Sequence, residues 1–416
     1  MRHRRLFFHA VNIILLLSAC DFRILGRRTG QLGPTQDLYR ITSIPQICPE
    51  SRLCRQLPAL ATLLWSHNPA PKFTRRSPLF VGRSDDRIRA RAPPVPMNAE
   101  KEQLNTKLSD VIHGTFESQG FKCSYRHKPA APGSEDKPPV LLIHPIGIGL
   151  SSWFWNPFLE KWDGSEVFVP DLIGCGESEI WDPSEKGLFI PLDYIRQLVK
   201  LWNTKIKRPM VVVAQGYLAP LGVRLATFES SDFQGSSTVC GLVLASPPAW
   251  SEVLNGYSDK EVAANFRQLS SPLGILGYRV LLGRFFIKLF SELFLFEKEA
   301  DERWLDEACA RATLDVRWPI IAQNAGMFGR ERLPTELQKG IIGSDSQLRY
   351  VSGIGQPTLV ISGNKDWKAS MRSAYMDGIV DCRLEELPGL NILPWESPAE
   401  TCQCIKAFVE SIGRED

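Results

Sequence analysis

The sequence has few histidines, and none of them follows residue 144. It contains six histidines in 416 residues, the last of which is His144. It also lacks a G-x-S-x-G motif, paired C-x-x-C motifs, clustered metal ligands and a complete glycine-rich phosphate loop. These absences argue against a histidine base in the second half of the chain, a zinc site and a nucleotide site. We therefore expect no metal and no cofactor.

Disulfides and membrane spans are also not indicated. The ten cysteines are scattered without the pattern of a disulfide framework, so reduced thiols are expected. Cys402 and Cys404 form a lone C-x-C without a nearby histidine, which does not make a metal site. The apolar run before Cys20 is only about ten residues long, too short to cross a bilayer.

The formal net charge is +3, but the charged residues are unevenly distributed along the chain. Residues 1–97 contain 16 basic residues, 15 of them arginine, and 5 acidic ones, whereas the remainder contains 33 basic and 41 acidic residues. A basic N-terminal region ahead of a mildly acidic body is typical of a targeting segment followed by a soluble domain. We expect no nucleic-acid partner.

Residues 1–97 are predicted to be a disordered targeting region. Met1–Cys20 resembles a secretory signal, with arginines followed by an apolar run. Residues 24–97 stay rich in arginine, poor in acidic residues and dotted with proline, serine and threonine, which is typical of organelle transit peptides. An ordinary disordered extension, partly the product of a mistaken start site, is the alternative. We favour an organelle address.

The body of the chain alternates short apolar runs with helix-compatible segments. After a predicted hairpin at 114–125, the strands are expected at 140–143, 167–169, 210–213, 242–245, 358–361 and 383–387, with helices at 153–162, 192–206, 217–228 and 399–412. This alternation predicts an α/β fold with a doubly wound, mostly parallel sheet and right-handed crossovers.

An insertion interrupts the alternation. Residues 251–349 form about a hundred helix-compatible residues between two strands, and Leu273–Phe296 is dense in leucine, phenylalanine and isoleucine. Arg279, Arg284 and Lys288 argue against a transmembrane helix. We favour a cap over an apolar pocket, with peripheral contact to a membrane surface as the alternative. The expected domains are the leader at 1–97, core parts at 98–250 and 350–416, and the cap at 251–349.

The stretch P-M-V-V-V-A-Q-G-Y-L-A-P predicts a strand that turns sharply into a helix. Such a turn is where a G-x-S-x-G motif holds a reactive serine. Here Gly216 occupies the serine position. Glycine adopts the strained backbone of this turn at little cost but supplies no nucleophile.

The region from about residue 110 to 412 resembles the α/β-hydrolase superfamily, in the branch with a helical cap inserted after the sixth strand. The matching pieces occur in the family's order: H-P-I-G, P-D-L-I-G-C-G-E-S, V-V-V-A-Q-G, P-T-L-V-I-S-G-N-K-D and L-N-I-L-P-W-E-S-P. The chain most resembles cyanobacterial and chloroplast members. With the arginine-rich leader, this implies a chloroplast protein, with a mitochondrial or secretory location as the alternatives.

The resemblance implies a Ser–Asp–His triad at Gly216, Asp366 and Asn391, of which only the acid is retained. Asparagine can donate and accept hydrogen bonds but cannot carry a proton at neutral pH. The resemblance also implies oxyanion-type donors at the backbone N–H groups of Ile146 and Tyr217. A serine-hydrolase mechanism is not expected.

His144, Trp153 and Trp155 are further candidates for the pocket. His144 begins the turn after a buried strand, where structural hydrogen bonding is the simpler interpretation. The two tryptophans fit either a ligand pocket or core packing. Asp366 in turn could merely fix the loop after its strand.

Two hypotheses of different classes follow. The first is a non-catalytic ligand-binding or interaction protein, with a capped pocket for a small apolar molecule such as a lipid, terpenoid or pigment. The second is an enzyme, a hydrolase or lyase, that uses Asp366 as a general acid or base on a small apolar ester or carbonyl compound.

Overall fold

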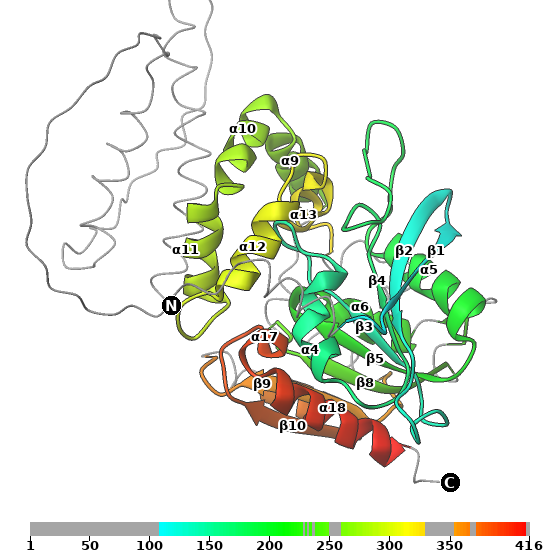
Figure 1. The fold of residues 1–416 in the computed structure, drawn as a ribbon. Coiled ribbons are helices and arrows are strands. Elements are labelled where there is room, and N and C mark those ends of the chain that lie inside the picture. The colour runs from blue at the N-terminus through cyan, green and yellow to red at the C-terminus, as the bar shows by residue number, and fades with distance from the viewer. Residues whose placement is uncertain are drawn as a thin grey trace, which may run out of the picture. The chain divides into compact units, whose positions relative to one another are not determined.

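The computed structural model describes residues 108–227, 229–230, 233–234, 238–248, 259–328, 353–366 and 372–412 (Figure 1). The predicted leader at 1–97 lies outside these residues, as do the three predicted domain boundaries. The fold described below is therefore that of the core and of the helices inserted into it.

The core is an eight-stranded sheet with the order β1-β2-β4-β3-β5-β8-β9-β10. The strands are β1 (Ile112–Ser118), β2 (Phe121–Lys128), β3 (Val140–Ile143), β4 (Val167–Pro170), β5 (Met210–Gln215), β8 (Val239–Ala245), β9 (Thr358–Gly363) and β10 (Cys382–Leu387). The six strands from β4 to β10 in this order are parallel to one another, and β2 pairs antiparallel with both of its neighbours, β1 and β4. The predicted doubly wound, mostly parallel sheet is confirmed.

Central strands are buried on both faces, which explains their continuous apolar sequence. In β5, Met210, Val212 and Ala214 join one hydrophobic cluster, and Val211 and Val213 join another on the opposite face. The chain therefore has a core on each side of the sheet.

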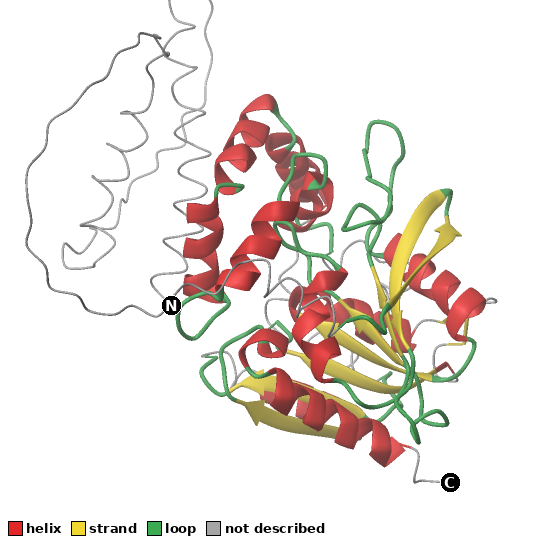
Figure 2. Cartoon of the chain, in the orientation of Figure 1, coloured by secondary structure: helices red, strands yellow, loops and turns green. Residues whose placement is uncertain are grey.

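Helices cover both faces (Figure 2). α5 (Leu192–Leu201) and α6 (Ala219–Thr227) contribute to the first cluster, and α4 (Asn156–Lys161) and α18 (Pro398–Ile412) to the second. Shorter elements complete this part of the fold: η1 (Ser152–Trp155), η2 (Trp202–Ile206), η3 (Gly216–Leu218), α16 (Ser373–Gly378), α17 (Leu393–Glu396) and the strand pair β6 (Glu229–Ser230) and β7 (Phe233–Gln234).

The described part of the insertion is helical. It contains α9 (Asp259–Leu269), α10 (Pro272–Leu281), α11 (Arg284–Phe294), α12 (Glu302–Arg311) and α13 (Arg317–Asn324). Among the described residues, no helix combines the length and the apolar character that a membrane crossing requires.

A cluster of aromatic rings joins the insertion to the core. Trp304 of α12 is 1% exposed, and its ring centroid lies 5.3 Å from those of both Trp153 and Trp395. Trp304 Nε1 donates to Ser291 Oγ of α11 at 3.0 Å, so its polar atom is satisfied inside the cluster. Nearby, a Cβ on Gly149 would lie 2.3 Å from the Ala308 carbonyl oxygen, so the loop after β3 touches α12 directly.

Replacing Trp304 with alanine should lower the free energy of unfolding by about 3–5 kcal/mol, because it leaves a large cavity between the insertion and the core. Urea unfolding followed by circular dichroism measures this change. The matched control is Phe285→Ala in α11, whose side chain is 61% exposed, and it should change stability by less than about 0.5 kcal/mol. Equal effects of the two substitutions would contradict the role assigned to Trp304.

Candidate functional site

The turn after β5 has the sharp geometry predicted from the sequence. β5 ends at Gln215 and α6 begins at Ala219, with only η3 between them. Gly216 has a φ of +61°, in the left-handed region that glycine adopts readily. A Cβ built on Gly216 would meet no atom of the described residues within 4 Å. The position therefore has room for a side chain but carries none.

Asn391 reaches this turn through its backbone. Gln215 Nε2 donates to the Asn391 carbonyl oxygen at 3.0 Å, whereas Asn391 Nδ2 donates to the Phe294 carbonyl oxygen at 3.4 Å. The Glu396 carboxylate accepts from the N–H groups of Asn391 at 3.1 Å and of Glu297 at 2.6 Å. Asn391 thus belongs to a link between the core and the insertion.

Asp366 forms a buried ion pair. Its Oδ2 accepts from Arg372 Nη2 at 2.7 Å, and both side chains are almost fully shielded from solvent. Arg372 also donates through Nε to the Pro247 carbonyl oxygen at 2.8 Å and through Nη1 to Ser362 Oγ. The carboxylate at the acid position is therefore neutralised by an arginine that is itself fixed to the ends of β8 and β9.

His144 is fully buried and uses both ring nitrogens for backbone contacts. Nε2 accepts from the Leu172 N–H at 3.1 Å, so Nδ1 carries the proton and donates to the Pro145 carbonyl oxygen at 2.9 Å. Burial lowers the pKa of His144, and the nearby Asp171 carboxylate only partly opposes this effect. The ring is a neutral connector between the loops after β3 and β4.

Asp171 organises the same two loops. Its Oδ1 accepts from the Ser152 N–H at 2.7 Å, and its Oδ2 accepts from the Glu177 N–H at 2.9 Å. A Cβ on Gly176 would lie 2.4 Å from the Asp171 carboxyl carbon, so only glycine fits there. Both carboxylate oxygens are engaged by the backbone.

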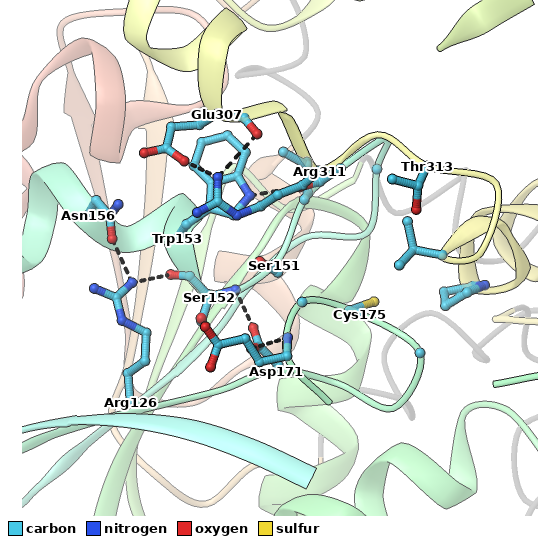
Figure 3. A pocket seen from close by; sticks show the side chains of 18 of the residues that line it. Arg126, Ser151, Ser152, Trp153, Asn156, Asp171, Cys175, Glu307, Arg311 and Thr313 are labelled. Atoms are coloured by element: carbon cyan, nitrogen blue, oxygen red, sulfur yellow. Dashed lines mark hydrogen bonds and ion pairs between the residues drawn. The ribbon is translucent and has the colours of Figure 1, made fainter. Parts of the chain in front are cut away.

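A cavity of about 510 Å³ lies between these loops, β2 and the insertion (Figure 3). Trp153, Leu150 and Ile320 supply apolar wall, and Arg126 and Cys175 also line it. Its lining comes from Leu108, His113, Arg126, the segments 147, 149–153 and 174–177, Asn156, Asp171, Glu307, Arg311, Thr313, Val316, Pro319 and Ile320. This volume is within the range of roughly 300–1,000 Å³ typical of small-molecule pockets.

The sequence-predicted pocket residues separate in the structure. Trp153 lines the cavity, and its Nε1 donates to the Gly149 carbonyl oxygen at 2.7 Å. Trp155 instead is fully buried in the hydrophobic core, and His144 lies outside the cavity lining. For Trp155 the pocket interpretation is corrected: the side chain faces the second hydrophobic cluster, where its large apolar surface is fully covered.

Cys175 does not present a reactive thiol. It lines the cavity, but burial and the neighbouring Asp171 carboxylate both raise its pKa. A thiol whose pKa lies above its ordinary value is protonated at neutral pH and is a poor nucleophile.

The chain was compared with known proteins. No model of a protein family matches it. A proline iminopeptidase of Lactobacillus helveticus is 26% identical over 151 residues, which is 35% of this chain and 48% of that protein. The chain therefore spans about half the length of the curated relatives that it matches.

Solved structures align over most of the chain. A haloalkane dehalogenase from Bradyrhizobium elkani aligns with a TM-score of 0.55 and 18% identity, covering 74% of this chain and 100% of that one. A bacterial membrane phospholipase A aligns with a TM-score of 0.51 and 16% identity, covering 76% and 91%. The chain has the α/β-hydrolase fold.

The three predicted triad positions and the two predicted oxyanion-type donors lie at one edge of the sheet. Ile146 follows β3, and Tyr217 follows Gly216 directly after β5; these two strands are parallel neighbours. Asp366 follows β9 and Asn391 follows β10. The topology therefore brings all five predicted positions to the carboxyl ends of parallel strands, while the hydrogen bonds of Asp366 and Asn391 go to other partners.

Two arginines at these sites were not predicted. Arg372 follows Asp366 by six residues, and its pairing could be suspected only from the rule that a buried carboxylate needs a counter-charge. Arg126 lies in a strand of the edge hairpin among other polar residues, where an exposed side chain is the ordinary expectation. Neither position belongs to a motif in this sequence.

Asp366→Ala should reduce the free energy of unfolding by about 3–5 kcal/mol, because it leaves the buried Arg372 without its counter-charge. Chemical denaturation monitored by tryptophan fluorescence measures the loss. Asp163→Ala is the matched control: Asp163 pairs with Lys406 at 2.9 Å, but its side chain is 75% exposed. The control should cost less than about 1 kcal/mol, and a similar small cost at Asp366 would refute the structural role of the pair.

His144 should make stability sensitive to acid. Its pKa is lowered from 6.5 in the folded chain, so protons bind preferentially to the unfolded chain. Its contribution is therefore fully present above about pH 6.5 and is lost as the pH falls below that value, by up to about 1.4 kcal/mol per pH unit.

The comparison is between the wild type and His144→Gln, whose side-chain oxygen can still accept from the Leu172 N–H. We expect the stability advantage of the wild type at pH 7.5 to shrink at pH 5.5, measured by denaturation at both values. A pH-independent difference between wild type and His144→Gln would contradict this assignment.

Proposed function

We propose that this chain is an α/β-hydrolase-fold protein that binds a small molecule beneath its inserted helices and does not turn it over by serine chemistry. The observation that carries the proposal is the glycine at the tip of the turn after β5. Gly216 keeps the left-handed backbone of a nucleophile turn but has no atom that could attack a carbonyl carbon.

The surroundings of Gly216 support the same conclusion. In a working triad, the acid orients the base, and the base takes the proton of the nucleophile. Here the Asp366 carboxylate pairs with Arg372, and the Asn391 side chain donates to a carbonyl oxygen of α11. His144, the last histidine of the sequence, already uses both ring nitrogens. Asp366, Asn391 and His144 therefore all use their side chains in other hydrogen bonds, and none of them is placed to act as the missing base.

The enzymatic alternative requires Asp366 to exchange a proton with a substrate. Its carboxylate is held by the buried guanidinium of Arg372, and a proton transfer at this carboxylate would break the pair and leave the arginine without its counter-charge. The similar proteins are named as enzymes, but fold alone does not carry their activity to this chain. Binding without turnover agrees better with these contacts.

The cavity supports a ligand that is small and largely apolar. Leu150, Trp153 and Ile320 supply apolar surface to the cavity, and Trp153 is fixed by its hydrogen bond to Gly149. A rigid aromatic wall favours flat or chain-like apolar molecules, including lipids, terpenoids and pigments. The arginine-rich residues 1–97 support delivery to the chloroplast as part of the same proposal.

A fluorophosphonate probe tests the absence of serine chemistry. The full chain should not be labelled, and esters of p-nitrophenol should be hydrolysed no faster than in buffer. Gly216→Ser should also remain unlabelled: a Cβ at this position meets no atom of the described residues, at a strain of about 1–3 kcal/mol, but the sequence has no histidine after His144 to activate the serine. A serine hydrolase labelled in parallel controls for the probe.

Labelling of the wild type at one defined residue, identified by peptide mapping, would refute the proposal. Strong labelling of Gly216→Ser would refute the argument that the base is missing.

A further inference from the structure

One arginine that lines the cavity is buried without a counter-ion among the described residues. Arg126 lies in β2 and is 8% exposed. Its Nη1 donates to Asn156 Oδ1 at 2.6 Å and to the Ser152 carbonyl oxygen at 3.4 Å (Figure 3). Within the described part of the chain, Nε is buried without a hydrogen-bond partner, Nη2 donates no hydrogen bond, and no carboxylate lies within ion-pair distance of the guanidinium.

The acidic groups around the cavity do not supply this partner. Both oxygens of Asp171 accept from backbone N–H groups. Glu307 pairs with Arg311, whose guanidinium lies 5.8 Å from the ring centroid of Trp153. Glu177 is mostly exposed and lies 3.5 Å from His113. These carboxylates act on Arg126 only at longer range, and burial outweighs them, so the pKa of Arg126 is lowered.

We propose that this cavity binds a small apolar molecule through a carboxylate group held by Arg126. The inference rests on the proposed function, because it names the chemical class of the ligand. Hydrogen bonds from a guanidinium to a carboxylate are charge-assisted and stronger than those between neutral groups. Within the described residues, Nη2 of Arg126 donates no hydrogen bond, whereas Nε is enclosed by the protein. A buried cation without a counter-ion costs free energy that a carboxylate bound at Nη2 recovers.

The other charges favour a monoanion. Asp171, Glu177 and Glu307 surround the cavity, and together they would repel a dianion such as a phosphate monoester more strongly than a carboxylate. The apolar wall at Leu150 and Ile320 provides a surface for the hydrocarbon body of the ligand. The expected ligand is thus a carboxylic acid with an apolar chain or ring.

Octanoate is a suitable probe, with octanamide, 1-octanol and octyl phosphate as comparisons of similar length. Isothermal titration calorimetry of the full chain at neutral pH should show binding of octanoate. Octanamide and 1-octanol should bind about tenfold or more weakly, since each lacks the charge-assisted hydrogen bonds to Arg126. Octyl phosphate should bind more weakly than octanoate.

Two substitutions test the residue assignment. Arg126→Gln should weaken octanoate binding by about tenfold or more. Asn156→Asp is the sharper variant, because it preserves the hydrogen bond to Nη1 and supplies an internal counter-ion. It should raise the melting temperature of the free protein and weaken octanoate binding. Arg208→Gln removes a positive charge that is 41% exposed and pairs with Glu166, and it should leave octanoate binding unchanged.

Several results would overturn this inference: no binding of octanoate, equal binding of octanoate and octanamide, tighter binding of octyl phosphate, or unchanged octanoate affinity in both Arg126→Gln and Asn156→Asp. Failure here is distinguishable from failure of the proposed function. Labelling by a fluorophosphonate would refute the latter while leaving carboxylate binding intact.

Discussion

Asp366 Oδ2 and Arg372 Nη2 lie 2.7 Å apart in the protein interior. Removing one of these charges would leave the other buried without the counter-charge of this pair, which is costly. Arg372 extends this pair to the Pro247 carbonyl oxygen after β8 and to Ser362 in β9. The pair therefore joins the carboxyl ends of two neighbouring strands. The residue at the predicted acid position therefore has a structural role that does not depend on a histidine partner.

Arg126 presents the same physical problem with a different outcome. Like Arg372 it is buried, and like Arg372 it donates to a backbone carbonyl oxygen and to a neutral side chain. Unlike Arg372, it has no carboxylate at contact distance within the described residues. A fold can retain such a charge when a ligand completes its coordination, and Arg126 lines a cavity large enough to hold one. The contrast between the two arginines is the physical basis for assigning a structural role to one and a binding role to the other.

The sequence predicted the sheet because each central strand is a short apolar run between turn residues, and burial on both faces demands that pattern. It also located the turn at Gly216, since a strand followed so closely by a helix leaves few alternatives. It could not predict the partners of Asp366, because the guanidinium that reaches it comes from a residue outside the recognised motifs. Trp155 shows a related difficulty. Trp153 and Trp155 lie two residues apart in a 3₁₀ helix and both pack in the second hydrophobic cluster, yet only Trp153 also lines the cavity. Such choices depend on tertiary packing, which composition and spacing do not contain.

The loop between His144 and Ser152 connects the two regions of interest. It begins beside the Gly216 turn, where β3 pairs with β5, and it ends in the wall of the cavity. Both ends of this loop form hydrogen bonds with the loop after β4. His144 Nε2 accepts from the Leu172 N–H, and the Ser152 N–H donates to Asp171 Oδ1. Neither hydrogen bond involves Gly216. The contacts that hold this loop beside the cavity are therefore separate from the turn at Gly216. Under the proposed function, this separation lets a hydrolase fold lack serine chemistry and still keep the loops that line a ligand pocket.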